Sequence, residues 1–127
     1  MTYQFQHHYT VDEARALLPQ IRAWLEQLED DRRVLQKSDG GTQKLLSDGY
    51  DVGGAKVNGW IRSFARIKGL LREFQQREIH IKDIERGLID FPALIQGREV
   101  FLCWEKDEED IEFWHDLDAG YAGREPL

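Results

Sequence analysis

The spacing of apolar residues divides the chain into a helical first half and a β-rich second half. In the first half, apolar residues recur every three or four positions, which predicts an amphipathic helix that ends near Lys37: Ala14, Leu17, Leu18, Ile21, Leu25 and Leu28. Thr10 and Glu13 form the capping-box pattern that is typical of a helix start. Pro19 lies inside the helix, and we expect a kink near Leu18 rather than a break, because proline removes one backbone hydrogen bond.

A second helical pattern runs from about Lys56 to Ile79, with apolar residues again three or four positions apart: Val57, Trp60, Ile61, Phe64, Ile67, Leu71 and Phe74. We expect the two helices to pack against each other as an antiparallel hairpin. Residues 38–56 join them and contain five glycines, which predicts a loop that is long for a compact domain.

After Ile79 the apolar residues alternate with polar ones, as they do in half-buried strands. This alternation predicts four strands and an irregular tail, with the strands at residues 79–83, 87–95, 98–104 and 111–117 and the tail at residues 118–127. Gln96-Gly97 is expected to close a β-hairpin, since glycine suits the positive φ of two-residue turns. A similar alternation at the N-terminus predicts one further short strand, formed by Tyr3, Phe5, His7 and Tyr9.

A turn at Gln96-Gly97 fixes the register of the predicted hairpin. One face then carries apolar residues that we expect to pack on the helices: Ile89, Phe91, Ala93, Ile95, Val100, Leu102 and Trp104. On the other face, Asp90 lies directly opposite Cys103. A slip of one residue would exchange the two faces, so the register is a specific prediction.

The orientation of the last strand decides which polar side chains join Asp90 and Cys103. If Phe113 faces the core, His115 is a core histidine, and the side chains beside Asp90 are Glu112, Trp114 and Asp116. If the orientation is reversed, His115 joins Asp90 and Cys103 instead. A Cys-His-Asp set suits a transition metal, whereas carboxylates alone suit magnesium, manganese or calcium. The sequence leaves both orientations open.

Together these elements predict an α+β fold in a single domain, residues 1–127. A long antiparallel helical hairpin packs on a small, mainly antiparallel β-sheet. Residues 1–79 hold the short strand and the hairpin, with its glycine-rich loop at 38–56. Residues 80–127 form a β-rich part with an acidic stretch and an irregular tail.

The formal net charge of −7 is concentrated in that acidic stretch. Residues 105–118 carry eight acids and one base, whereas residues 1–104 carry 15 acids and 15 bases. A dense anionic surface attracts cations and repels phosphate backbones, so nucleic acid is disfavoured as a partner. Metal ions, a basic protein or water alone could face these acids. The basic residues of segment 56–78 could also dock there, in the same chain or in a second subunit.

The cysteine count, the length of the apolar runs and the N-terminal sequence exclude several classes of protein. A single cysteine, Cys103, excludes an internal disulfide and a multi-cysteine zinc module. The apolar runs fall far short of the roughly 20 residues that cross a bilayer, so we expect no membrane partner. The N-terminus lacks the pattern of a signal peptide, and we therefore expect a cytoplasmic protein.

Asp90 is the residue that most needs a functional explanation. A carboxylate in the middle of a strand requires a cation or several hydrogen-bond donors. The structural alternative is an ion pair with one of three arginines, Arg86, Arg98 or Arg124. Cys103 and His115 have structural interpretations of their own, as a small buried apolar residue and as a hydrogen-bonded core histidine. Arg124 is interpreted first as a counter-charge for the acidic stretch and second as an anchor for an anionic ligand.

Several of these segments resemble an uncharacterised bacterial family, domain of unknown function 2203. The resemblance rests on residues 9–21 (YTVDEARALLPQI), Lys82-Asp83, 87–92 (GLIDFP), 97–104 (GREVFLCW) and 113–124 (FWHDLDAGYAGR). It spans nearly the whole chain except residues 38–56 and implies a small cytoplasmic protein, without an activity or cofactor. Asp83 and Trp104 lie inside the motifs that carry the resemblance, and we therefore add them to the candidate site residues.

The leading hypothesis is a binding protein with a polar site on the β-rich part, whose cofactor is a divalent metal ion. In this hypothesis the metal ligands are Asp90, His115, Asp116 and Asp118, and the ligand-binding residues are Asp83, Trp104 and Arg124. The alternative is a non-enzymatic interaction module that forms a homodimer through its helical hairpin and uses an acidic surface for a basic partner. An enzyme with a hydrolytic metal site ranks third, since the sequence contains no identifiable nucleophile and base.

Overall fold

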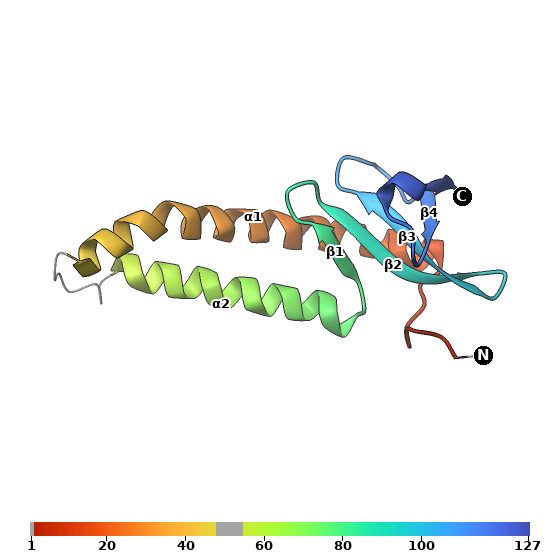
Figure 1. Cartoon of the computed structure of the whole chain (residues 1–127), viewed down its shortest axis with the longest axis horizontal. Coiled ribbons are helices and arrows are strands. Elements are labelled where there is room, and N and C mark those ends of the chain that lie inside the picture. Colours follow the sequence, from red (N-terminus) through yellow and green to blue (C-terminus); the bar gives the residue numbers. More distant parts are fainter. Residues whose placement is uncertain (1, 48–54) are drawn as a thin grey trace.

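The structure is a computed structural model that describes residues 2–47 and 55–127, with side chains described for residues 2–37 and 57–127. Two helices precede a five-stranded sheet: α1 (Val11–Ser47), α2 (Ala55–Gln76), β1 (His80–Asp83), β2 (Leu88–Ile95), β3 (Arg98–Glu105), β4 (Phe113–Asp116) and β5 (Glu125–Pro126), with a 3₁₀ turn η1 (Tyr121–Gly123) before β5. The strands pair in chain order, each antiparallel to the next. The predicted α+β fold, a helical hairpin on an antiparallel sheet, is confirmed. The hairpin extends well beyond the sheet (Figure 1).

Helix α1 begins at the predicted capping box and continues through Pro19. The Thr10 amide donates to the Glu13 carboxylate and the Glu13 amide donates to the Thr10 hydroxyl, each over 3.0 Å. The predicted end near Lys37 is wrong, because the helix continues to Ser47. Glycine costs a helix only about 1 kcal/mol relative to alanine, so an established helix can propagate through a glycine pair. The remainder of the predicted loop, residues 48–54, lies outside the described residues.

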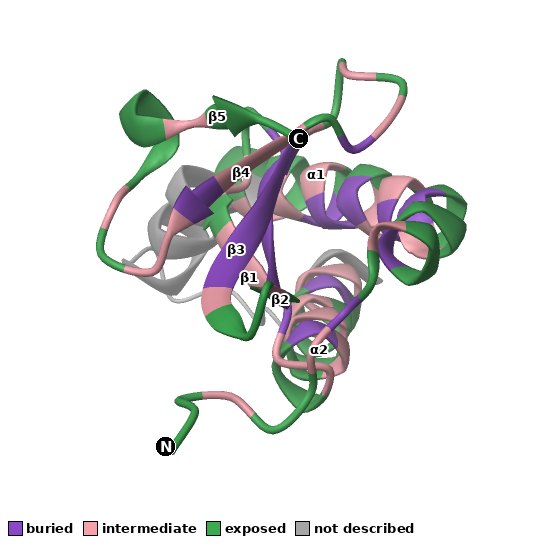
Figure 2. Cartoon of the chain, turned by 90° about the vertical axis from the view of Figure 1, so that its right-hand side faces the viewer, coloured by how far each residue is buried: buried purple, intermediate pink, exposed green. Residues whose placement is uncertain are grey.

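The core lies between α1, the C-terminal part of α2 and the inner face of the sheet. It is formed by apolar residues with almost no exposed surface, among them Ala14, Ile21, Leu28, Phe74, Ile89, Phe91, Val100, Leu102 and Trp104. Figure 2 looks at the end of the molecule opposite the hairpin tip, and buried residues follow β2, β3 and one stripe of each helix. Further along the hairpin, Asp31 of α1 is buried and its carboxylate accepts three hydrogen bonds from Arg66 of α2. Arg66 thereby lowers the pKa of Asp31.

The β2–β3 hairpin has the predicted register throughout, from Leu88 opposite Glu105 to Ile95 opposite Arg98. Its turn residues Gln96 and Gly97 both have positive φ, 52° and 78°, as a two-residue hairpin turn requires. The predicted apolar face therefore packs on the helices, and Asp90 and Cys103 pair on the opposite, outer face of the sheet.

The predicted strand at residues 3–9 is wrong, because these residues form an irregular arm. Two carboxylates, rather than a neighbouring strand, bind its amides. Glu99 accepts from the amides of Gln4 and Phe5, and Glu78 accepts from the amides of Gln6 and His7. Only the Tyr9 amide donates to a strand carbonyl of the sheet, that of Pro92, over 2.7 Å. Alternating apolar residues thus fit an arm laid against the sheet edge as well as they fit a strand.

The C-terminal region is more ordered than the sequence predicts. β4 is shorter than the expected strand at 111–117, and the expected irregular tail contains η1 and β5, which pairs with β4. The Leu127 amide also donates to the Glu112 carbonyl over 2.9 Å. Among the described residues, neither helix is apolar over a stretch that could cross a bilayer.

Candidate metal site

Three buried polar side chains meet on the outer face of the sheet. Asp90 lies in β2 and pairs with Cys103 in β3. His115 lies in β4 and pairs with Phe101, which is two residues before Cys103 in β3. The last strand therefore has the second of the two orientations that the sequence left open. Its Trp114 packs against the core, and His115 points to the same face as Asp90.

The imidazole of His115 is fixed through both ring nitrogens. Nδ1 lies 2.7 Å from the carbonyl oxygen of Asp116, and Nε2 lies 3.0 Å from Oδ2 of Asp90. A carbonyl oxygen only accepts hydrogen bonds, so Nδ1 carries the donated hydrogen. The contact between Nε2 and Oδ2 then needs one further proton, which either the imidazole or the carboxyl group provides. Asp90 and His115 thus share a proton at a position where both groups have only 2% exposed surface.

The thiol of Cys103 completes this group. Only 1% of the residue is exposed, and burial, reinforced by the neighbouring Asp90 carboxylate, raises the pKa of the thiol to about 12. Near neutral pH the free thiol therefore stays protonated and is a poor nucleophile. The sulfur, an Asp90 carboxylate oxygen and a ring nitrogen of His115 all lie within 4.8 Å of one another.

One oxygen of this group lacks a hydrogen-bond partner. Oδ1 of Asp90 is fully buried and accepts no hydrogen bond from the part of the chain whose side chains are described. A buried polar atom without a partner costs about 1–3 kcal/mol, and more when it carries charge. The unpaired oxygen, beside a thiol and an imidazole, has the chemistry of a metal ligand.

His80 and Phe5 border the group on the side of β1 and the N-terminal arm. His80 pairs with Asp90 across the β1–β2 ladder, and its ring contacts Phe101 and Phe5 at centroid distances of 5.1 Å. Burial, followed by the charge of Lys82, lowers the pKa of His80, although Asp90 acts in the opposite direction. Sequence reasoning missed His80, but the alternation of Ile79 and Ile81 already assigns it to the outer face.

Two of the four predicted metal ligands lie elsewhere. Asp116 pairs with Arg98, and Asp118 is exposed. The orientation that brings His115 to the outer face turns Asp116 to the other one, and Asp118 lies in the turn after β4. Of the predicted set, the structure brings together Asp90 and His115 and adds Cys103.

The three predicted ligand-binding residues have structural roles. Asp83 accepts a hydrogen bond from the Arg86 amide in the turn after β1. Trp104 has no exposed surface, and its indole donates to the carbonyl of Glu108. Arg124 donates to both carboxylate oxygens of Glu108, over 2.6 and 2.8 Å, which agrees with its first interpretation as a counter-charge.

Half of the acidic stretch is neutralised in the same way. Four of its eight acids bind arginines of the same chain, in the pairs Glu105–Arg86, Glu108–Arg124, Asp110–Arg15 and Asp116–Arg98. Within the described residues these arginines come from α1, the β1–β2 turn, β3 and the tail, and none comes from segment 56–78. The acids that stay exposed are Asp107, Glu109, Glu112 and Asp118.

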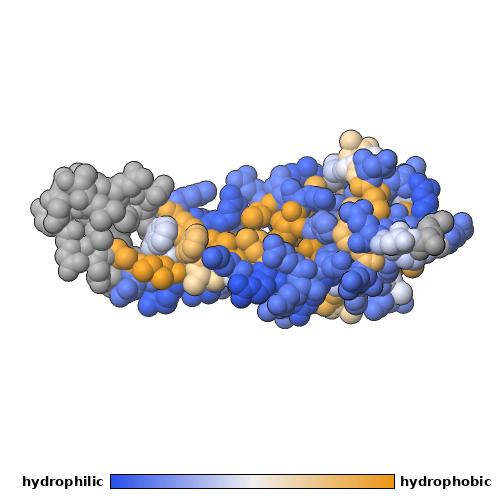
Figure 3. All heavy atoms as spheres, turned by 60° about the horizontal axis from the view of Figure 1, so that its bottom comes forward, coloured by the Kyte–Doolittle hydropathy of each residue, from blue (hydrophilic) through white to orange (hydrophobic). Residues whose placement is uncertain are grey.

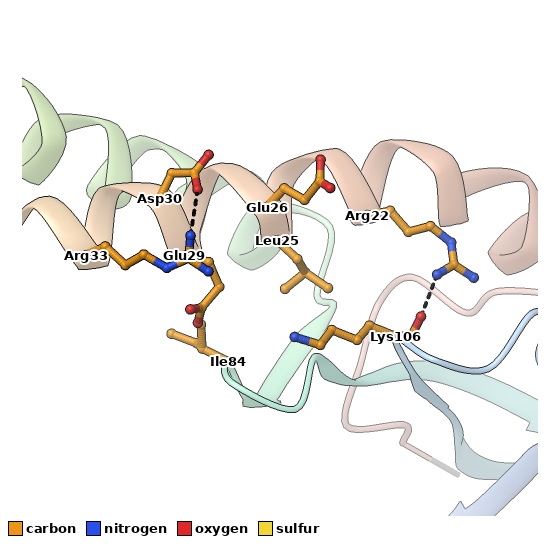
Figure 4. A pocket seen from close by; sticks show the side chains of 8 residues that line it. All are labelled: Arg22, Leu25, Glu26, Glu29, Asp30, Arg33, Ile84 and Lys106. Atoms are coloured by element: carbon orange, nitrogen blue, oxygen red, sulfur yellow. Dashed lines mark hydrogen bonds and ion pairs between the residues drawn. The ribbon is translucent and has the colours of Figure 1, made fainter.

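A separate hollow of about 570 Å³ lies between α1 and the ends of β1 and β3. Lys106 extends into it toward α1, where Leu25, Glu26 and Glu29 line the wall (Figure 4). The hollow is open and of mixed charge, and it contains none of the three residues of the buried group. It therefore adds no ligand to the candidate site.

A family model described as an uncharacterised conserved protein, DUF2203, matches residues 7–127. The chain belongs to the DUF2203 family. The match includes both helices, all five strands and the three residues of the buried group. No curated protein and no solved structure matches the chain. The function of this DUF2203 protein is therefore inferred from the chemistry of the site.

Proposed function

We propose that this DUF2203 protein binds a divalent transition-metal ion through Asp90, Cys103 and His115. The observation that carries the proposal is the unpaired, buried Oδ1 of Asp90 inside a group whose three ligand atoms lie within 4.8 Å of one another. A bound cation would give this oxygen the partner that it lacks. It would also replace the proton between Asp90 and His115 as the positive charge that holds the two groups together.

The donor set favours a borderline or soft cation. Carboxylate oxygen, thiolate sulfur and imidazole nitrogen are typical zinc ligands, at distances of about 2.0–2.3 Å, whereas magnesium and calcium prefer oxygen alone. Two ligands of one such ion lie about 3–4 Å apart. The present separations, including 3.0 Å between Nε2 and Oδ2, need only small side-chain movements to reach that geometry. Three protein ligands leave a fourth position for water or a further ligand.

Metal binding at this group must release protons. The thiol of Cys103 has a pKa of about 12, so near neutral pH it loses its proton only when a cation takes the proton's place. Nε2 of His115 must also be free of hydrogen to coordinate. The affinity is therefore expected to rise with pH, and each binding event to release two protons, one from the thiol of Cys103 and the one shared by Asp90 and His115.

The alternative function, an acidic surface for a basic partner, has weaker support. Four of the eight acids in residues 105–118 are already bound to arginines, which leaves four exposed acids along a loop and a strand end. Exposed charges of this kind contribute little affinity and are screened by salt. The homodimer and the cytoplasmic location stay predictions.

Titration with Co²⁺ tests the proposal, because a cobalt–thiolate bond gives charge-transfer absorption in the near ultraviolet that carboxylates cannot give. The wild-type chain is expected to show this band and to lose it on addition of Zn²⁺. Cys103→Ala should abolish the band, and Asp90→Asn should weaken the Co²⁺ affinity at least ~100-fold.

The matched control is Asp116→Asn, which removes a carboxylate of the neighbouring ion pair and should leave the Co²⁺ spectrum unchanged. Circular dichroism and urea unfolding establish whether each variant is folded. A wild-type protein without a charge-transfer band, or a band that persists in folded Cys103→Ala, would overturn the proposal.

A further inference from the structure

The outer face of the sheet is buried around the three candidate ligands, although both helices pack on the inner face. Asp90, Cys103 and His115 have only 1–2% of their surface exposed. Within the described residues, two segments cover this face. The tail lies on the β4 side, where Cζ of Arg124 is 4.0 Å from the centroid of the Phe113 ring. The N-terminal arm lies on the β1 side. Access to the three ligands therefore depends on the tail and the arm.

The arm, residues 2–9, crosses the outer face from the free edge of β2. At one end, the Tyr9 amide donates to the carbonyl of Pro92, which lies beyond the part of β2 that pairs with β1. At the other end, the Tyr3 hydroxyl donates to a carbonyl of the β2–β3 turn over 2.8 Å. Figure 3 shows mostly hydrophilic residues over this end of the molecule. The arm contributes several exposed polar side chains there: Gln4, Gln6 and His7.

Phe5 is the residue of the arm that lies over the candidate site. Its ring contacts the rings of Phe101 and His80, at centroid distances of 5.4 and 5.1 Å. His80 pairs with Asp90 across the β1–β2 ladder, and Phe101 contacts the His115 ring at 5.5 Å. Phe101 is only 4% exposed, although it lies on the face opposite the core. Phe5 therefore covers the two rings that flank Asp90 and His115.

Side-chain carboxylates attach the arm to the rest of the chain. Four successive amides of the arm, those of residues 4–7, donate to them, the first two to Glu99 and the last two to Glu78. The tail is attached differently, because its strand β5 pairs with β4. Release of the arm would leave every strand pair of the sheet in place, whereas release of the tail would break one. The arm is therefore the cover that can open at the lower cost.

We propose, on the basis of the metal site proposed above, that the N-terminal arm is a movable cover that controls the entry and release of the metal ion. When the arm is closed, Phe5 shields the rings beside Asp90 and His115 from solvent. When it opens, the outer face between β1 and β3 is exposed while the core on the inner face stays packed. Local opening of a segment with few strand hydrogen bonds is a common way to admit a ligand to a buried site.

The reactivity of Cys103 tests the cover without any metal. Cys103 is the single cysteine of the chain, so alkylation by iodoacetamide reports one site. Glu78→Gln/Glu99→Gln weakens the hold on the arm, because a neutral amide oxygen accepts weaker hydrogen bonds than a carboxylate does. Alkylation of the folded, metal-free variant should be at least ~10-fold faster than that of the wild-type chain. Phe5→Ala, which keeps both carboxylates, should accelerate it as well.

Two controls establish that the arm, and not another opening, gives access to the thiol. Glu109→Gln/Glu112→Gln makes the same change of charge at two exposed acids and should keep the wild-type rate. Tyr121→Ala removes a ring that covers Arg124 on the tail side, at 4.6 Å, and should also keep it. In the arm variants, the rate should depend little on urea below the unfolding transition, since local opening exposes little surface.

The exchange of Co²⁺ tests the control of the metal ion itself. In Glu78→Gln/Glu99→Gln, both the uptake of Co²⁺ and its loss to excess chelator should be at least ~10-fold faster, while the affinity stays within about threefold of the wild-type value. Faster exchange in both directions is the result expected of a cover, whereas loss of a ligand would lower the affinity.

The outcomes separate this proposal from the proposed function. A wild-type chain that takes up no Co²⁺ would overturn the proposed function, and this proposal with it. A chain that binds Co²⁺ but whose arm variants keep the wild-type rates of alkylation and exchange would overturn this proposal alone. Acceleration by Tyr121→Ala and not by the arm variants, or a rate in the arm variants that follows global unfolding in urea, would also overturn this proposal alone.

Discussion

Nε2 of His115 lies 3.0 Å from Oδ2 of Asp90, and this contact joins β4 to β2 across the intervening strand β3. Both side chains are buried on the outer face of a sheet whose inner face forms the core. The contact therefore has two consequences. It stabilises the order of the strands, and it positions two metal-ligand types next to the thiol of Cys103.

The first prediction concerns the stability of the metal-free chain. His115→Phe removes the partner of Asp90 and leaves a buried carboxyl group unpaired, so the free energy of unfolding should fall by about 3 kcal/mol. Replacement of both residues, Asp90→Leu/His115→Phe, removes the unpaired group as well and should cost less than the single change. Urea unfolding with chelator present measures both values. A double variant that is less stable than the single one would contradict this account of the pair.

The second prediction concerns the reactivity of Cys103. Burial raises its pKa to about 12, about three units above the ordinary value of 9.0, so the thiolate fraction near neutral pH should be ~1,000-fold lower than that of a free cysteine. Alkylation by iodoacetamide in the metal-free chain should therefore be slow and should accelerate in urea. The same chain in denaturant is the control. Fast alkylation of the folded chain near neutral pH would contradict the buried position of the sulfur.

The third prediction concerns pH and His80. Because burial lowers the pKa of His80, the unfolded chain binds a proton more readily than the folded chain does. Stability from this residue is present above the unfolded pKa of about 6.5 and declines as the pH falls below it. His80→Asn should reduce the loss of stability between neutral pH and about pH 5. His7→Asn, a change at an exposed histidine of the arm, is the control and should keep the wild-type profile.

The fourth prediction concerns the N-terminal arm. The Glu99 carboxylate binds the amides of Gln4 and Phe5 and also contacts the His8 ring over 2.7 Å. Burial alone would raise the pKa of Glu99, but these partners lower it overall. Glu99→Gln should release the arm, which hydrogen exchange would register as faster exchange at residues 4 and 5. Glu112→Gln, at an exposed acid, is the control, and equal protection in both variants would contradict the role of Glu99.

Local signals in the sequence were sufficient for most of the fold. Gln96-Gly97 specified a turn of one geometry, and that turn together with the alternation of Ile89 and Phe91 determined the register of β2 and β3. The same pattern of alternation does not give a strand in the N-terminal arm. The apolar and polar side chains of the arm do alternate, but side-chain carboxylates, and not a neighbouring strand, bind its amides. The extension of α1 to Ser47 does not follow from local signals, because glycines favour the end of a helix and this helix continues through Gly40 and Gly41.

The candidate site could be predicted only in part. Asp90 was identified because a carboxylate inside an apolar strand is rare without a partner, and its position opposite Cys103 followed from the turn. The position of His115 depends on how β4 pairs with β3, which is a non-local contact that no residue of β4 specifies. The same pairing turns Asp116 toward Arg98 and away from Asp90, and Asp118 lies in the turn after β4.

Elemental analysis of tag-free protein, purified without chelator, shows whether Asp90, Cys103 and His115 hold a metal ion. The wild-type chain is expected to contain about one equivalent of a transition metal, with zinc the first candidate, and folded Cys103→Ala and Asp90→Asn are expected to lose it. Asp118→Asn should retain the metal, because Asp118 lies outside the buried group. A metal-free wild-type protein that also takes up no added Zn²⁺ would show that the three residues form no metal site.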